Sequence, residues 1–141
     1  MKNSKVFFTA FALSLCFVLT HCTRDPDGLV SSTEEVLIRN VWSVDYYYHN
    51  QDMTNDYGSS RILFSSTGAV GYQKNGETIP GTWTTTIDAL NNELITLHFN
   101  TTDPNVSRLN ETWKLTDKST SSLQFEETDG ITNILFRIKT Q

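Results

Sequence analysis

Six side chains on runs of alternating polarity are best suited to recognise a ligand: Tyr46, Tyr48, Tyr72, Trp83, Glu111 and Trp113. Tyrosine and tryptophan combine an apolar ring with one hydrogen-bonding group, and a buried hydroxyl or carboxylate needs a partner. Such residues together are typical of a cavity that holds a small, partly apolar molecule. We therefore predict that they line a binding cavity. The simpler interpretation of the aromatic ones is that they fill a core.

Side chains for reaction or metal chemistry are sparse. Outside the N-terminal leader the histidines are His49 and His98, and the sequence has no glycine-rich phosphate loop, nucleophile elbow or H-x-x-x-H spacing. A metal site formed by His49 with Asp45, Asp52 or Asp56 is conceivable, because imidazole and carboxylates are common metal ligands. We prefer the interpretation of an outward strand residue beside a solvated acidic loop. We expect no enzymatic activity, no bound metal and no cofactor.

The N-terminus has the pattern of an exported protein. Lys2 and Lys5 precede an uncharged, mostly apolar run at residues 6–20, which is short for a membrane span and typical of a signal peptide. Leu-Thr-His-Cys at 19–22 resembles a bacterial lipobox, with His in a place usually held by Gly, Ala or Ser. The resemblance implies that Cys22 becomes the lipidated first residue. A disulfide is the alternative, but its partner would be Cys16, which is lost with the leader.

This pattern predicts three parts: a signal peptide at 1–21, the lipidated Cys22 with a polar linker at 22–32, and a β-domain at 33–141. Removal of the leader leaves nine basic and 16 acidic residues, a net charge of −7. An acidic surface disfavours nucleic acid and anionic membrane surfaces as partners. We expect a monomer that is lipid-anchored to the outer membrane of a Gram-negative bacterium, at its periplasmic face or at the cell surface.

The residues from 33 onward predict a short helix and a series of strands. Ser32 and Glu35 form a capping box ahead of about two helical turns. Asn75-Gly76 predicts a tight hairpin turn, because both residues tolerate positive φ. Alternation places strands at 42–49, 61–65, 69–74, 77–87, 93–99, 108–116, 121–127 and 131–139. In the first strand, Trp42, Val44, Tyr46 and Tyr48 are expected on one face.

Sequential antiparallel strands joined by short turns favour an all-β, eight-stranded up-and-down barrel. Closure removes the two exposed edges that an open sheet would leave. A barrel of this size is just wide enough to fill its own interior or to hold one small ligand. A flattened sandwich of two sheets is the alternative, because period-two alternation fits both.

The short helix, the strand that opens on Trp42, GTW at 81–83 and ETWKL at 111–115 resemble bacterial lipocalin-like domains of Bacteroidetes lipoproteins. The resemblance covers roughly residues 33–139. Asn40 stands where lipocalins have a glycine two residues before the tryptophan. The resemblance implies a barrel that binds small apolar molecules, with Arg137 or Lys139 packed over Trp42. The function of the bacterial members is generally unassigned.

Two functions remain. The preferred one is a non-enzymatic, membrane-anchored lipoprotein whose barrel binds a small, partly apolar ligand. The alternative is a cell-surface interaction module with a solid core, whose loops at 50–60 and 100–107 contact a protein partner. An internal cavity of roughly a few hundred cubic ångströms would favour the first function. A barrel filled with side chains would favour the second.

Overall fold

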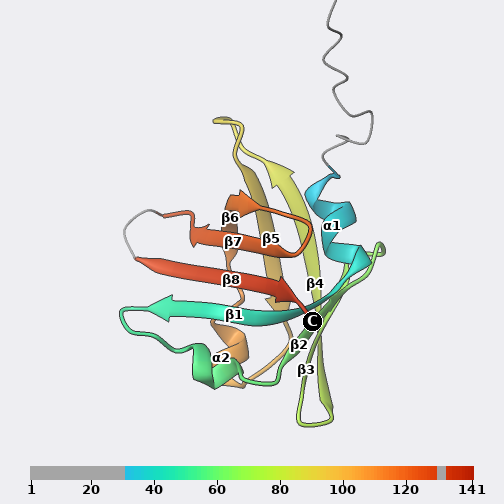
Figure 1. Cartoon of the computed structure of the whole chain (residues 1–141), viewed down its shortest axis with the longest axis vertical. Helices are drawn as coiled ribbons and strands as arrows, with labels where there is room; N and C mark the ends of the chain where they lie inside the picture. Colours follow the sequence, from blue (N-terminus) through green and yellow to red (C-terminus); the bar gives the residue numbers. More distant parts are fainter. Residues whose placement is uncertain (1–30, 130–132) are drawn as a thin grey trace, which may run out of the picture. The chain divides into compact units, whose positions relative to one another are not determined.

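Eight antiparallel strands follow one another around a closed barrel in the computed structural model, which describes residues 31–129 and 133–141 (Figure 1). The strands are β1 (Val41–His49), β2 (Arg61–Phe64), β3 (Ala69–Lys74), β4 (Glu77–Ile87), β5 (Glu93–Phe99), β6 (Thr112–Lys118), β7 (Ser122–Glu127) and β8 (Ile134–Thr140). Helices α1 (Thr33–Arg39) and α2 (Pro104–Ser107) and the 3₁₀ turn η1 (Thr54–Tyr57) complete the fold. Neither helix in this part of the chain is long and apolar enough to cross a bilayer.

Each strand pairs with the next one, and β8 returns to pair with β1. This ring confirms the predicted up-and-down barrel and excludes the sandwich. The turn between β3 and β4 is the predicted one. Asn75 and Gly76 have φ values of 54° and 83°, in the left-handed region that a tight hairpin turn requires. Closure satisfies the strand edges that an open sheet would expose.

Helix α1 covers one end of the barrel. Ser32 Oγ accepts a hydrogen bond from Glu35 N at 3.2 Å, as expected for an N-cap. Val36 and Leu37 are buried against the barrel, and Asn40 Nδ2 donates to Val36 O at 3.1 Å. Asn40 has a φ of −124°, so the backbone here does not require the glycine that lipocalins carry.

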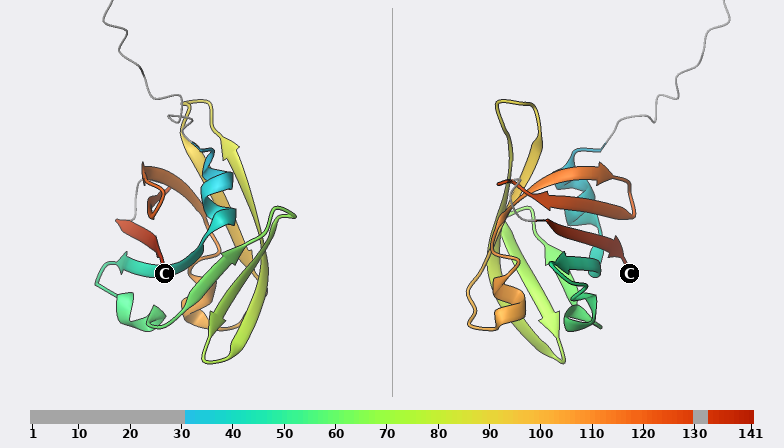
Figure 2. Two further views of the ribbon diagram at one scale, coloured as in Figure 1. Left: turned by 45° about the vertical axis from the view of Figure 1, so that its right-hand side comes forward. Right: turned by 90° about the vertical axis from the view of Figure 1, so that its left-hand side faces the viewer.

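The opposite end is closed by α2 and η1, which were predicted as loops (Figure 2). Asp103 Oδ1 accepts hydrogen bonds from Asn105 N at 2.8 Å and Val106 N at 3.3 Å, and α2 begins at Pro104. The Tyr57 hydroxyl in η1 donates to Asn105 O at 2.9 Å. Tyr57 and Val106 are each 1% exposed. The two connections therefore plug this end of the barrel together.

Strand β6 begins at Thr112 and not at the predicted Arg108. The side-chain amide of Asn110 takes the place of a neighbouring strand's backbone groups. Its Oδ1 accepts a hydrogen bond from Phe99 N at 2.6 Å, and its Nδ2 donates one to Phe99 O at 3.0 Å. The chain can leave the sheet here without leaving the polar groups of Phe99 unpaired. For the last strand, predicted residues 131 and 132 lie outside the described part of the chain.

A β-bulge in β1 reverses the expected orientation of two candidate ligand residues. The register against β8 shifts between Val44 and Tyr46, so Asp45 is an extra residue. Val44 points inward as predicted, but beyond the bulge the buried residue is Tyr47, which is 1% exposed. Tyr46 and Tyr48 lie on the outer face. The prediction that they point into the barrel is therefore wrong.

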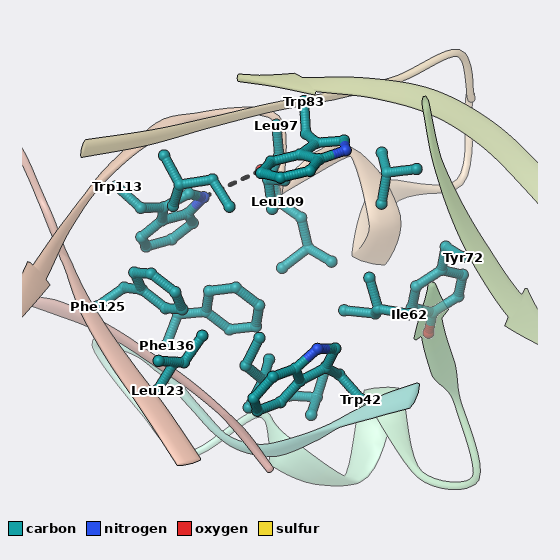
Figure 3. Close-up of a cluster of buried hydrophobic side chains, with 14 of the residues drawn as sticks. Trp42, Ile62, Tyr72, Trp83, Leu97, Leu109, Trp113, Leu123, Phe125 and Phe136 are labelled. Carbon is teal, nitrogen blue, oxygen red and sulfur yellow. Dashed lines mark hydrogen bonds between the residues drawn. The ribbon is translucent and has the colours of Figure 1, made fainter. Parts of the chain in front are cut away.

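Large apolar side chains converge on the barrel interior from the surrounding strands (Figure 3). Trp42, Leu109, Trp113 and Leu123 are 0% exposed, and Phe136 is 1% exposed. A space wide enough for water beside these side chains would give them accessible surface. The centre of the barrel is therefore a packed core and not a cavity.

The close approach of β4 and β5 at Gly81 can be tested by substitution. A Cβ at Gly81 would lie 2.4 Å from His98 O and 2.9 Å from Phe99 Cδ1. We expect Gly81→Ala to lower the free energy of unfolding by about 1–3 kcal/mol, because the strands must move apart. Gly71→Ala is the matched control, since its Cβ would meet Thr78 Cγ2 at an ordinary 3.6 Å. Equal urea midpoints for the two variants would contradict the close approach.

Candidate functional site

Three of the six predicted ligand residues lie inside the core. Trp83 donates its indole N–H to Ser65 O at 3.0 Å, and Trp113 donates to Leu109 O at 3.1 Å. Tyr72, Trp83 and Trp113 are 2%, 4% and 0% exposed, and burial raises the pKa of the Tyr72 hydroxyl. These three side chains belong to the packed interior.

The other three predicted residues lie outside the barrel interior. Tyr46 and Tyr48 stack on the outer face of β1 with ring centroids 6.5 Å apart. The Arg137 guanidinium lies 5.7 Å from the centre of the Tyr46 ring, so it does not pack over the buried Trp42. Glu111 is exposed in the connection before β6. The six residues therefore do not form one site.

Asp45, the extra residue of the bulge, binds two basic residues of β8. Its carboxylate lies 2.6 Å from Lys139 Nζ and 2.7 Å from Arg137 Nε. The hydrogen bond from Lys139 lowers the pKa of Asp45, burial raises it, and Arg137 lowers it further, so the net shift is downward. This cluster ties β1 to β8, and Lys139, like Arg137, is engaged on the outer face and not over the buried Trp42.

His49 does not belong to a metal site among the residues that the structure describes. His49 is half-buried at the end of β1. Among the residues that the structure describes, no group of three His, Cys, Asp or Glu side chains is placed to hold a metal ion. Cys22, the predicted lipidation site, lies outside the described residues.

An open, largely apolar groove of about 380 Å³ lies at the α1 end of the barrel. One side is the inward face of β4 to β7, where two cross-strand pairs, Thr85 with Ile95 and Leu115 with Phe125, border the core. The other side is the first turn of α1 at residues 32–34. Figure 2 shows this helix beside the ends of β4 and β5. Small-molecule sites typically have volumes of about 300–1,000 Å³.

A polar cluster joins α1 to the strands at this groove. The Glu93 carboxylate accepts a hydrogen bond from Thr33 Oγ1, and Lys118 Nζ lies 3.1 Å from both Glu93 Oε1 and Thr33 Oγ1. Burial raises the pKa of Glu93, but the Thr33 hydrogen bond and the Lys118 ammonium outweigh it and keep the pKa below its ordinary value of 4.5. The cluster fixes the first turn of α1 against β5 and β6.

The groove begins where the inward residue of β4 changes from Trp83 to the much smaller Thr85. Trp83 fills the core, but the next inward position is Thr85, which is too small to fill the same space. Ile87, the inward residue after that, is 67% exposed. The strands β4 and β5 remain paired through Ile87, so the hairpin continues past the core. The change from Trp83 to Thr85 at successive inward positions of β4 is the sequence signal of the groove, and the six predicted ligand residues did not indicate it.

No family model and no curated protein sequence matches this chain. Among solved structures, the fold is similar to that of a DUF4847 family protein from Bacteroides vulgatus, with a TM-score of 0.56 and 15% sequence identity. The match covers 77% of this chain and 96% of the other protein. Similarity at this identity supports the barrel fold, and function does not transfer with it.

The pH dependence of stability tests the cluster at Glu93. Because the pKa of folded Glu93 lies below 4.5, its stabilisation is complete above that pH and is lost as the pH falls through the folded-state value. Its side chain is 41% exposed, so solvent screening limits the contribution. We expect Glu93→Gln to destabilise the protein by about 0.2–1 kcal/mol at neutral pH. Urea denaturation should show this difference shrinking below pH 4.5.

Glu77→Gln is the matched control for this experiment, because Glu77 is exposed at the other end of β4. A Glu93→Gln effect that stays constant across the acidic range would contradict the ionised cluster.

Proposed function

We propose that this protein is a membrane-anchored lipoprotein whose barrel holds a small, partly apolar ligand in the groove at the α1 end. The observation that carries the proposal is the groove itself, an opening of about 380 Å³ beside a filled barrel centre. The proposed site differs from the predicted one, because none of the six predicted residues lines the groove.

The apolar part of the ligand would lie against Ile95, Leu115 and Phe125. Ile95 and Phe125 are 2% and 1% exposed, and the Phe125 ring stacks on Phe136 with centroids 5.6 Å apart. These two side chains therefore form the rigid floor of the groove and offer little accessible surface of their own. Leu115 is only half-buried and would be covered on binding. Apolar burial is favourable by about 25 cal/mol per Å², which favours an alkyl chain or a ring over a fully polar ligand.

The polar groups of the groove favour an uncharged or cationic head group. The lining includes two carboxylates, Glu34 and Glu93. Lys118 approaches from an adjoining hollow, but its ammonium is already paired with Glu93 at 3.1 Å. An anionic head group would meet net negative charge, whereas a hydroxyl or ammonium group can donate to carboxylate oxygens.

Lipid anchoring at Cys22 is the second part of the proposal. It is supported by the lipobox-like run at 19–22 and by the polar linker that follows. Each buried CH₂ group of an acyl chain contributes about 0.8 kcal/mol, and more than one chain makes attachment stable. The protein would then be a monomer on the outer membrane of a Gram-negative bacterium, without a cofactor or enzymatic activity.

The filled barrel centre favours the alternative function, a surface interaction module, and so does a second observation at the plugged end. The two predicted contact loops are held together there. The Tyr57 hydroxyl donates to Asn105 O at 2.9 Å, and Arg108 Nη1, directly after the second loop, lies 3.6 Å from Asp56 Oδ2. Under this proposal a protein partner would contact this joint surface, with the packed core behind it.

Matched substitutions on β4 test the ligand groove. Thr85 lines the groove, whereas its neighbour Thr84 is exposed and faces outward. We expect Thr85→Trp to fill the groove and to weaken binding of dodecanol and dodecylamine by about tenfold or more, which corresponds to about 1.4 kcal/mol. Thr84→Trp should bind as the wild type does. Isothermal titration calorimetry on residues 31–141, which contain the whole core, measures both affinities.

Methyl NMR locates the ligand in the same titration. The resonances of Ile95 and Leu115 should shift, and those of the fully buried Ile62 should not. Equal binding by the two tryptophan variants would contradict this site, and a preference for dodecanoate would contradict the proposed head group. Failure of the wild-type domain to bind any of the three compounds would favour the interaction module.

A further inference from the structure

We propose that Leu90, at the tip of the β4–β5 hairpin (residues 88–92), inserts into an uncharged lipid surface while the Asp88 carboxylate stays among the head groups, and that this contact turns the mouth of the groove towards the bilayer. This inference rests on the proposed function, because it uses both the lipid anchor at Cys22 and the ligand groove. The surface that the apolar tip contacts is the membrane to which the protein is tethered.

Two large apolar side chains are exposed on this hairpin. Leu90 is 83% exposed and Ile87 is 67% exposed, the highest values among the large hydrophobic residues in the described part of the chain. Single exposed apolar side chains are normal on protein surfaces, so exposure alone does not indicate a membrane contact. Ile87, however, also lines the groove. The exposed apolar surface of the hairpin therefore adjoins the mouth of the groove.

The turn that carries Leu90 is held by its own hydrogen bonds. Asp88 Oδ1 accepts from Leu90 N and Asn92 N at 2.8 Å each, and Asn92 Nδ2 donates to Asp88 Oδ2 at 2.8 Å. Asn91 has a φ of 64°, a conformation that asparagine adopts more readily than most residues. Leu90 is therefore fixed at the tip and does not fold back onto the barrel.

The anchor would be attached to the chain a short distance in sequence before the groove. Ser32 and Ile87 line the same groove, and Figure 1 shows the hairpin and the first turn of α1 at the same end of the barrel. Ser32 is only ten positions after Cys22, and that length of chain spans at most about 36 Å when fully extended. A lipid on Cys22 would therefore keep this end of the barrel within reach of the bilayer surface.

Charge selects the type of lipid. Hydrogen bonds from Asn92 lower the pKa of Asp88, so the tip carries a carboxylate at neutral pH, and Glu34 and Glu93 line the adjoining groove. An anionic surface would repel these groups. Two apolar side chains are too few to hold a free protein on a bilayer. On a tethered protein the effective lipid concentration is high, so the same weak contact can set the orientation.

An inserted tip would bring the groove mouth against the lipid. A partly apolar ligand could then pass between the bilayer and the groove without crossing bulk water. The ligand class implied by this arrangement is an uncharged or cationic amphiphile that is itself dissolved in the membrane.

Depth measurements on the lipidated, full-length mature protein test the orientation. After leader removal Cys22 is the only cysteine and its thiol is blocked by lipid, which mass spectrometry verifies, so new cysteines can be spin-labelled selectively. Leu90→Cys reports on the tip, and Glu77→Cys reports on the opposite end of β4. In phosphatidylcholine vesicles we expect the label at position 90 to be relaxed more by oxygen than by a water-soluble nickel complex. The label at position 77 should show the reverse.

A transfer measurement separates this inference from the proposed function. Leu90→Asp should slow uptake of dodecylamine from phosphatidylcholine vesicles by about tenfold, with its affinity in aqueous solution unchanged. Thr84→Asp on the outer face of β4 is the matched control. Equal nickel accessibility at positions 77 and 90, or wild-type uptake by Leu90→Asp, would overturn the insertion while groove binding stands. Loss of all amphiphile binding in the wild type, or an unmodified Cys22, would overturn the proposed function itself.

Discussion

A buried indole must place its single N–H on an acceptor, and the barrel depends on meeting this requirement at each of its tryptophans. Trp42, Trp83 and Trp113 donate to Leu37 O, Ser65 O and Leu109 O at 2.9, 3.0 and 3.1 Å. The acceptors belong to α1, to the β2–β3 turn and to the residues ahead of β6. The side chains that fill the centre therefore also fix the connections at the two ends of the barrel.

This arrangement explains why the candidate site lies at one end and not in the middle. Aromatic residues that are large enough to line a cavity are also large enough to fill an eight-stranded barrel. The groove begins where Trp83 gives way to Thr85 along β4, and its far wall is a helix. The position of that helix depends on Thr33, Glu93 and Lys118. These three residues come from three different elements, so no local pattern could indicate the helical wall of the site.

The strands were largely predictable because their causes are local. The alternation of apolar and polar residues predicted the approximate bounds of the strands. The turn at Asn75-Gly76 was predictable because both residues tolerate the positive φ that it requires. The bulge was not predictable, because Asp45 is held by Arg137, which lies 92 positions further along the chain. One extra residue was enough to exchange the inward and outward faces over the second half of β1. The late start of β6 has a similar cause, because the side-chain amide of Asn110 makes the hydrogen bonds to Phe99 that a paired strand would otherwise make.

The first and last strands close the barrel by pairing from Trp42 with Thr140 to His49 with Ile134. Contacts between residues so far apart in sequence form slowly. Until β8 pairs with β1, the folding chain is therefore an unsealed sheet with the edge of β1 exposed. Only the seven residues of β8 complete the cylinder. Before these residues pair, the chain is at its most vulnerable to aggregation and proteolysis.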